Sequence, residues 1–71
     1  MSVAKVIELT ATSPNSFEDA IKQGISRAAK TLKHIDGAWI KEQKVTIEEG
    51  RITGYRVNMM VTFVLDGAVD E

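Results

Sequence analysis

The chain has 71 residues, of which 44% are hydrophobic and 27% charged. This composition is typical of a folded domain, but a domain so short buries only about 60% of its unfolded surface and is marginally stable alone. Disulfides are excluded because the chain has no cysteine, and a Cys/His zinc site is nearly excluded because His34 is the only histidine. We therefore expect self-association to supply stability.

The charge balance argues against a nucleic-acid partner. Nine Lys and Arg residues stand against ten Asp and Glu residues, so the net charge of −1 leaves no basic surplus for phosphate binding. No stretch reaches the roughly 18 apolar residues of a membrane span, and the N-terminus lacks the apolar core of a signal peptide. We expect a cytoplasmic protein without a membrane partner.

The first expected element is a strand over residues 3–10. The alternation of apolar residues there predicts that Val3, Ile7 and Leu9 face the core. Residues 11–16 are small and polar and include the only proline, a composition typical of a loop.

A helix is expected to begin at Phe17. Ser16 precedes it and Asp19 follows three residues after the serine, which resembles a capping box. Apolar positions then recur with the helical period, at Phe17, Ala20, Ile21, Gly24, Ile25, Ala28 and Leu32. Gly24 either lets a strand approach the helix closely or is simply tolerated. Residues 34–37 are expected to end the helix.

Two further strands are expected over residues 38–47 and 52–65, and a turn at residues 48–51 joins them as a hairpin. The later strand alternates most regularly, and its expected core face holds Tyr55, Val57, Met59, Val61, Phe63 and Leu65. Residues 66–71 form an acidic end that is expected to fray.

The expected architecture is α+β: a β-α-β-β chain with one helix against a three-stranded antiparallel sheet. One helix covers one sheet face, so the other face, expected to be concave, stays bare. The last strand is also expected to outrun its partners and to leave backbone groups unpaired. Neighbouring subunits would cover both features, and we predict a homo-oligomer.

Few residues suggest catalysis. The chain has no Cys nucleophile, no Gly-rich phosphate loop and no motif around its histidine. His34, expected in the last helical turn, is predicted to be a surface or capping residue, and Asp36 a turn former. Glu48 and Glu49 are expected to form a solvated hairpin tip, with cation binding as the alternative. We do not expect an enzyme.

Trp39 is the main candidate for binding. It is the only tryptophan, lies early in a strand and follows the small residues Gly37 and Ala38. Three roles are open: packing in the core, stacking on a planar ligand, or contacting another subunit. Arg56 and Gln43 could hydrogen-bond such a ligand or could be ordinary polar strand residues.

The chain resembles the dodecin family from Val3 to Asp66. The resemblance depends on the order and spacing of Lys5-Val6-Ile7-Glu8-Leu9, Thr12-Ser13-Pro14, Ser16-Phe17, Ala20-Ile21, Arg27-Ala28, Thr31-Leu32, Tyr55-Arg56-Val57 and Val61-Thr62-Phe63. It implies a dodecin-like domain over residues 1–66, an acidic tail at residues 67–71, and a hollow dodecamer in which the sheet curls around its helix.

The resemblance also implies a flavin ligand. Many dodecins stack flavins in pairs between tryptophans, and a glutamine of the third strand touches the isoalloxazine ring. Here Gly37 stands at the tryptophan's usual position and Arg56 at the glutamine's. Trp39 falls on the same side of its strand as Gly37, about 6.6 Å away, and could serve as a shifted platform. Arg56 would then favour an anionic or electron-rich ligand edge.

Two functions follow from the resemblance. The first is a non-catalytic oligomer that binds and sequesters riboflavin, FMN or a related flavin, with Trp39, Arg56, Gly37 and Gln43 as binding residues. The alternative is a structural or cation-binding assembly that binds no flavin. For that alternative, Asn15 and Glu42 match positions near metal sites of some relatives, which implies a divalent cation.

Overall fold

The computed structural model describes residues 3–65. β1 spans Ala4–Ser13, α1 spans Phe17–Ala28, β2 spans Ile35–Glu48 and β3 spans Arg51–Val64. The predicted α+β class and the β-α-β-β order are confirmed. The prediction of a fraying acidic end falls on residues 66–71, which lie outside the described residues.

The three strands form one antiparallel sheet in the order β1-β3-β2, with β2 and β3 as the predicted hairpin. β3 pairs with β1 from Val64 to Tyr55 and with β2 along nearly its whole length. The expectation that the last strand would outrun its partners is therefore correct for β1, which ends opposite Tyr55, and wrong for β2. β1 continues through residues 11–13, which were expected in the loop, and β2 begins at Ile35 rather than Ala38. The unpaired edges of the described chain are the outer edges of β1 and β2, and residues 51–54 of β3 on the side where β1 has ended.

The helix begins where the sequence predicts. The side chain of Ser16 accepts a hydrogen bond from the Asp19 backbone N–H at 2.9 Å, so Ser16 caps α1. The ring of Phe17 then packs edge-on against Tyr55 of β3, with a centroid distance of 5.1 Å, which ties the start of the helix to the central strand.

The helix ends at Ala28, earlier than the apolar pattern predicts. Residues 29–32 continue as turns in which the backbone N–H groups of Thr31 and Leu32 both bond to the Ala28 carbonyl. His34 has a positive φ of 64°, which a right-handed helix does not allow. His34 thus lies in the connection to β2, not in the last helical turn, and Asp36 lies within β2 at a bulge rather than in a turn.

The core is small and lies between α1 and the middle of β3. Val57, Met59 and Val61 are fully buried, as their alternation predicts, and Ala20 of the helix packs against them. Gly24 is the point of closest approach: a Cβ atom there would lie 2.7 Å from Met59 Cε and 3.1 Å from Ala11 Cβ. Of the two alternatives for Gly24, the close approach is confirmed.

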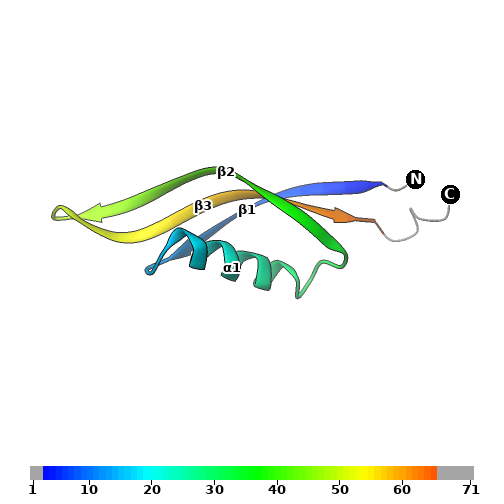
Figure 1. The fold of residues 1–71 in the computed structure, drawn as a ribbon, viewed down its shortest axis with the longest axis horizontal. Helices are drawn as coiled ribbons and strands as arrows, with labels where there is room; N and C mark the ends of the chain where they lie inside the picture. The colour runs from blue at the N-terminus through cyan, green and yellow to red at the C-terminus, as the bar shows by residue number, and fades with distance from the viewer. Residues whose placement is uncertain (1–2, 66–71) are drawn as a thin grey trace.

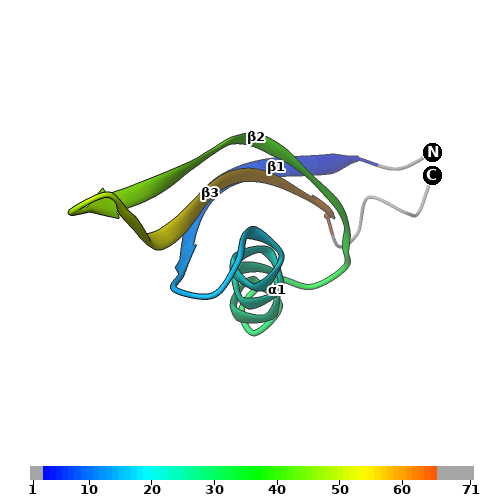
Figure 2. The same ribbon diagram turned by 60° about the vertical axis from the view of Figure 1, so that its left-hand side comes forward.

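The sheet arches over the helix, and α1 lies in the hollow of the arch (Figures 1 and 2). The sheet face without a helix is therefore the convex one, and the expectation of a bare concave face is wrong. The twist of the strands curves the sheet, and α1 lies on the concave side (Figure 2).

The hairpin of β2 and β3 projects beyond α1 and the end of β1 (Figure 1). Its two-residue turn, Glu49 and Gly50, has positive φ at both positions, which suits the twist of the strands and confirms the predicted turn. The radius of gyration is 14.8 Å, against about 11 Å for a compact domain of this length. The subunit is extended, with little core for its size.

Candidate functional site

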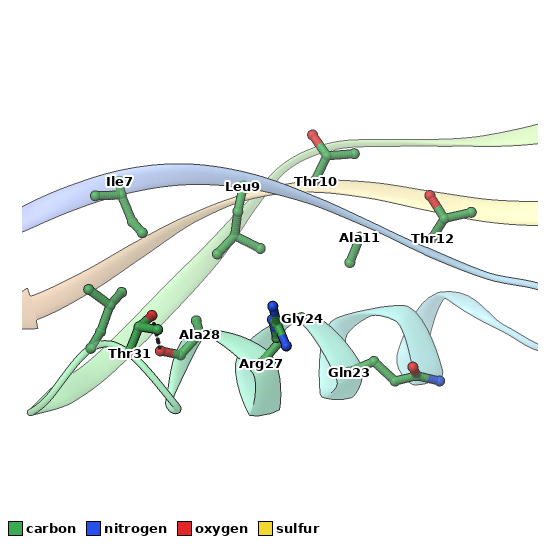
Figure 3. A pocket seen from close by; sticks show the side chains of 11 residues that line it. Ile7, Leu9, Thr10, Ala11, Thr12, Gln23, Gly24, Arg27, Ala28 and Thr31 are labelled. Carbon is green, nitrogen blue, oxygen red and sulfur yellow. Dashed lines mark hydrogen bonds between the residues drawn. The ribbon is translucent and has the colours of Figure 1, made fainter.

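The candidate site lies on the convex surface of the sheet, which we call the helix-free face. Its side chains alternate with the core residues of each strand. They are Val6, Glu8, Thr10 and Thr12 of β1; Gly37, Trp39, Lys41, Glu42 and Lys44 of β2; and Arg56, Asn58, Met60 and Thr62 of β3. Figure 3 shows the alternation along β1, where Leu9 and Ala11 point toward α1 while Thr10 and Thr12 point away from it.

Trp39 occupies this face with half of its surface exposed. It pairs with Met60, which in turn pairs with Glu8, so the three residues form a row across the sheet. Trp39 is 52% exposed, which excludes core packing within one subunit and leaves ligand stacking or a subunit contact. Its exposed ring is the largest apolar group on the helix-free face.

Gly37 lies on the same face as Trp39, as strand parity predicts. It pairs with Thr62, and a Cβ atom built on it would meet no other atom within 4 Å. The two positions are separated by about 6.6 Å along β2. The strand surface next to the indole is therefore open.

Arg56 shares the helix-free face with Trp39, but Gln43 does not. Arg56 lies four residues along β3 from Met60, about 13 Å from the tryptophan row. Gln43 pairs with the buried Val57 and so belongs to the face that carries α1. A bulge between Ile40 and Glu42 adds one residue to β2 and reverses the parity of the positions that follow.

A chain of polar contacts crosses the sheet between Trp39 and Arg56. Thr10 Oγ1 donates to Asn58 Oδ1 at 2.9 Å, and Asn58 Nδ2 donates to Glu8 Oε2 at 3.2 Å. Lys41 Nζ lies 3.5 Å from Glu8 Oε1 and connects β2 to this chain. Sequence reasoning missed these residues, because only the register of the strands brings them together.

Asn15, one of the two candidate metal ligands, lies in the connection between β1 and α1. Its side chain donates to Asp19 Oδ2 at 3.4 Å, and the same oxygen accepts hydrogen bonds from Ser13 Oγ and from Gln23 Nε2. The hydrogen bond from Ser13, followed by that from Gln23, holds the pKa of the Asp19 carboxyl below its usual value. Asp19 thereby joins the end of β1 to the first turns of the helix.

Glu42, the other candidate ligand, lies on the helix-free face opposite Asn58. One subunit therefore does not bring Asn15 and Glu42 together. Among residues 3–65 no three His, Cys, Asp or Glu side chains gather as a metal site would require. Glu48 and Glu49 lie at the hairpin tip, and among residues 3–65 no third acidic, histidine or cysteine side chain gathers with them. The alternative of cation binding at this tip therefore has no support in one subunit.

A groove of about 520 Å³ lies between β1 and α1 (Figure 3). Ile7, Leu9 and Ala11 line it from the strand, and Gly24 and Ala28 from the helix. None of the binding residues predicted from the sequence lines this groove, although Thr10 and Thr12 of the helix-free face border it along β1.

Comparison with known proteins gives one consistent family. The Dodecin family model matches residues 3–66. A curated dodecin from Thermus thermophilus is 41% identical over 64 residues, which cover 90% of this chain and 93% of the relative. A calcium dodecin from Mycobacterium tuberculosis is 39% identical over 64 residues, with 89% of each chain covered.

Solved structures agree with these relatives. A crystal structure of a T. thermophilus dodecin mutant superposes with a TM-score of 0.88 at 39% identity, covering 93% of this chain and 98% of that one. The calcium dodecin of M. tuberculosis, described as a calcium-chelating antigen with a novel calcium-binding site, gives a TM-score of 0.79 at 32% identity and covers 99% and 100% of the two chains. Within residues 3–65, no helix is long and apolar enough to cross a membrane.

Proposed function

The chain belongs to the dodecin family, and we propose that it binds and stores a flavin or a closely related planar ligand as a subunit of a homo-oligomer. The observation that carries this proposal is the position of Trp39, which is half exposed on the helix-free face beside Met60. An aromatic ring that stays half in water offers apolar surface for a planar ligand to cover. Dodecins form homo-oligomers and bind flavins without catalysis, which supports the same role here.

Each proposed contact has a separate task. Trp39 provides the stacking surface, and the open strand surface at Gly37 leaves room for a ring that extends past the indole. Arg56 donates hydrogen bonds to an electron-rich or anionic part of the ligand. Gln43 lies on the opposite face of β2, and we assign it no contact within its own subunit. A bound flavin would supply a redox-active ring system, and these residues would hold that ring against the sheet.

Fluorescence titration tests this function directly. Riboflavin and FMN are added to the purified protein, and the emission of the flavin and of Trp39 is followed. Because Trp39 is the only tryptophan, its emission reports on this site alone. We expect stacking to quench both signals, and we expect Trp39→Ala to lose flavin binding while Trp39→Phe, which retains an aromatic ring, keeps part of it. Unchanged emission at tens of micromolar flavin would overturn the proposal.

A cation-binding assembly is the second candidate, favoured by the similarity to a relative named calcium dodecin. Asn15 and Glu42 lie apart in one subunit, so a divalent cation would have to be shared between subunits. The Asn15 amide donates to Asp19, which leaves its carbonyl oxygen as the group that would meet a cation. Calcium should then raise the thermal midpoint of chelator-treated protein, and Asn15→Ala or Glu42→Gln should remove that rise while Glu49→Gln should not.

We also propose the cytoplasm as the location of this assembly. Fractionation of cells that express the protein with an epitope tag would test this location. Recovery of the tagged protein in a membrane or extracellular fraction would contradict it.

A further inference from the structure

The groove between β1 and α1, which we call the β1–α1 groove, is an apolar surface that the described chain leaves open. Leu9 and Ala11 of the strand face Gly24 and Ala28 of the helix across it (Figure 3). β1 is an edge strand of the sheet, so no further strand closes the groove on its outer side. A volume of about 520 Å³ accommodates several apolar side chains.

The helix side of this groove is positively charged. Of the described residues that line it, Arg27 alone is charged. Between Asp19 and Asp36 the sequence has four Lys or Arg residues and no Asp or Glu. Within residues 3–65 Arg27 also has no acidic side chain within 4 Å. An occupant that suits the groove therefore has a negative charge beside an apolar part.

The tip of the β2-β3 hairpin, residues 47–52, has these properties. Ile47 and Ile52 pair across the two strands, so their exposed side chains lie next to each other. Glu48 lies opposite Arg51, which offsets its charge. Glu49, in the turn, has no basic side chain within 4 Å among the described residues. The hairpin tip thus combines an apolar pair with an acid whose charge is not balanced.

A subunit cannot place this tip in its own groove. The hairpin projects beyond α1 and the end of β1 (Figures 1 and 2). Gly24 of the groove lies against Met59, and Ile52 is seven residues from Met59 along β3, a distance of about 23 Å. Only a second copy of the chain brings the two surfaces together.

We propose that the hairpin tip of one subunit inserts into the β1–α1 groove of a second copy, with Ile47 and Ile52 on its apolar floor and Glu49 beside Arg27. The tip and the groove are different surfaces of one chain, so the contact is heterologous and runs in one direction from copy to copy. Contacts of this kind close into rings when the rotation allows it. The contact shares with the proposed function only the association of copies, and it does not depend on a flavin.

Disulfide cross-linking tests the contact directly, because the chain has no cysteine of its own. A disulfide requires Cα atoms within about 7 Å, which positions 27 and 49 of one subunit do not satisfy. Oxidation of Arg27→Cys/Glu49→Cys should therefore link different subunits into dimers and longer chains on a non-reducing gel. The matched control is Lys22→Cys/Glu49→Cys. Lys22 is exposed on α1 but is not among the groove residues, and this variant should give less than about a tenth of the linked product.

Charge reversal tests the pairing of Glu49 with Arg27. Arg27→Glu and Glu49→Arg should each raise the protein concentration at which the oligomer dissociates by about fivefold at low salt, because each places like charges in contact. The combined variant Arg27→Glu/Glu49→Arg restores opposite charges and should return to within about twofold of wild type. Single reversals that leave dissociation unchanged would remove this pair from the contact.

Cross-linking, light scattering and flavin titration together separate the outcomes. Selective cross-linking of Arg27→Cys/Glu49→Cys without flavin binding refutes the flavin function and leaves the contact standing. If the chain is oligomeric but the two double-cysteine variants cross-link equally or not at all, the contact is refuted and the assembly stands. A wild-type chain that is monomeric at micromolar concentration refutes both the assembly and the contact.

Discussion

Trp39 lies two residues after Gly37 on β2, and this spacing determines where along the strand a planar ligand can stack. Both residues lie on the helix-free face, so the aromatic platform is displaced along the strand and not turned away from it. Position 37 has no atom within 4 Å of a built Cβ, and its φ is not in the left-handed region that requires glycine. The backbone therefore permits an aromatic side chain at position 37.

The variant Gly37→Trp uses this freedom. A second indole beside Trp39 should enlarge the stacking surface, and one further aromatic contact of about 1.4 kcal/mol corresponds to roughly tenfold tighter flavin binding. Affinity is measured by quenching of flavin emission. Gly37→Leu adds bulk without an aromatic face and is the matched control. Equal affinities for the two variants would show that stacking area does not limit binding.

Asp19 is the residue at which pH should affect the fold. The hydrogen bonds from Ser13 and Gln23 lower the pKa of this carboxyl in the folded state below the value of 3.8 expected without them. A depressed folded-state pKa gives stability that is present above the unfolded-state pKa and is lost as pH falls through the folded-state pKa. We expect the thermal midpoint to fall as pH drops below about 4.

The variant Asp19→Asn isolates this contribution. It should have a lower thermal midpoint than wild type near neutral pH and a shallower decline between neutral pH and pH 3. Glu18→Gln changes the neighbouring carboxylate, which forms only an exposed ion pair with Lys22, and should follow the wild-type curve. Parallel curves for wild type and Asp19→Asn would contradict the role given to this carboxyl.

At the scale of elements, the sequence predicts their kind and order more reliably than their ends. The cap at Ser16 and the alternation of β3 are local signals: the cap is confirmed, and the alternation is confirmed at Val57, Met59 and Val61, whereas Leu65 follows the strand and is 36% exposed. Residues 11–13 look like a loop because they are small and polar, but pairing with β3 makes them strand. Strand pairing joins residues that are far apart in the sequence, so local composition does not predict it. The local apolar pattern likewise does not predict that α1 ends at Ala28.

The same limit applies to the candidate site. Parity correctly predicts that Gly37 and Trp39 share a face, since no irregularity lies between them. The bulge between Ile40 and Glu42 shifts the alternation of β2 by one residue, so Gln43 lies on the face that carries α1. The pairing of Lys44 with Arg56 depends on this bulge as well, so the sequence alone could not bring the two charges together.

Gly24 shows how closely the helix and the sheet meet. Alanine favours helix by about 1 kcal/mol over glycine, but its methyl group would crowd Met59 and the backbone-fixed Cβ of Ala11. Overpacking costs about 1–3 kcal/mol, so Gly24→Ala should lower the free energy of unfolding by about 1 kcal/mol on balance. Chemical denaturation measures it. Ser26→Ala, at an exposed position of α1, should not be destabilising, and a stabilised Gly24→Ala would contradict the tight contact.

The whole molecule has the shape of a subunit rather than of a self-sufficient domain. Its described core contains few fully buried side chains, and the hairpin extends past the helix without a third strand beside its tip (Figure 1). A two-stranded hairpin is marginally stable in water by itself. Neighbouring copies of the chain are expected to cover this projecting segment, in keeping with the homo-oligomers that dodecins form.

Ile47 and Ile52 at the hairpin tip are the residues that should report on this contact. They pair with each other and are 61% and 53% exposed, an arrangement that leaves apolar surface at the end of the subunit. The double variant Ile47→Thr/Ile52→Thr keeps two β-branched residues but makes them polar. It should raise the protein concentration at which the oligomer dissociates at least tenfold, as measured by light scattering over a dilution series. The nearly isosteric Ile47→Val/Ile52→Val should assemble much more like wild type, because it keeps the tip apolar. A threonine variant with the wild-type assembly curve would exclude the tip from the interface, and a wild-type chain that is monomeric at micromolar concentration would refute the assembly itself.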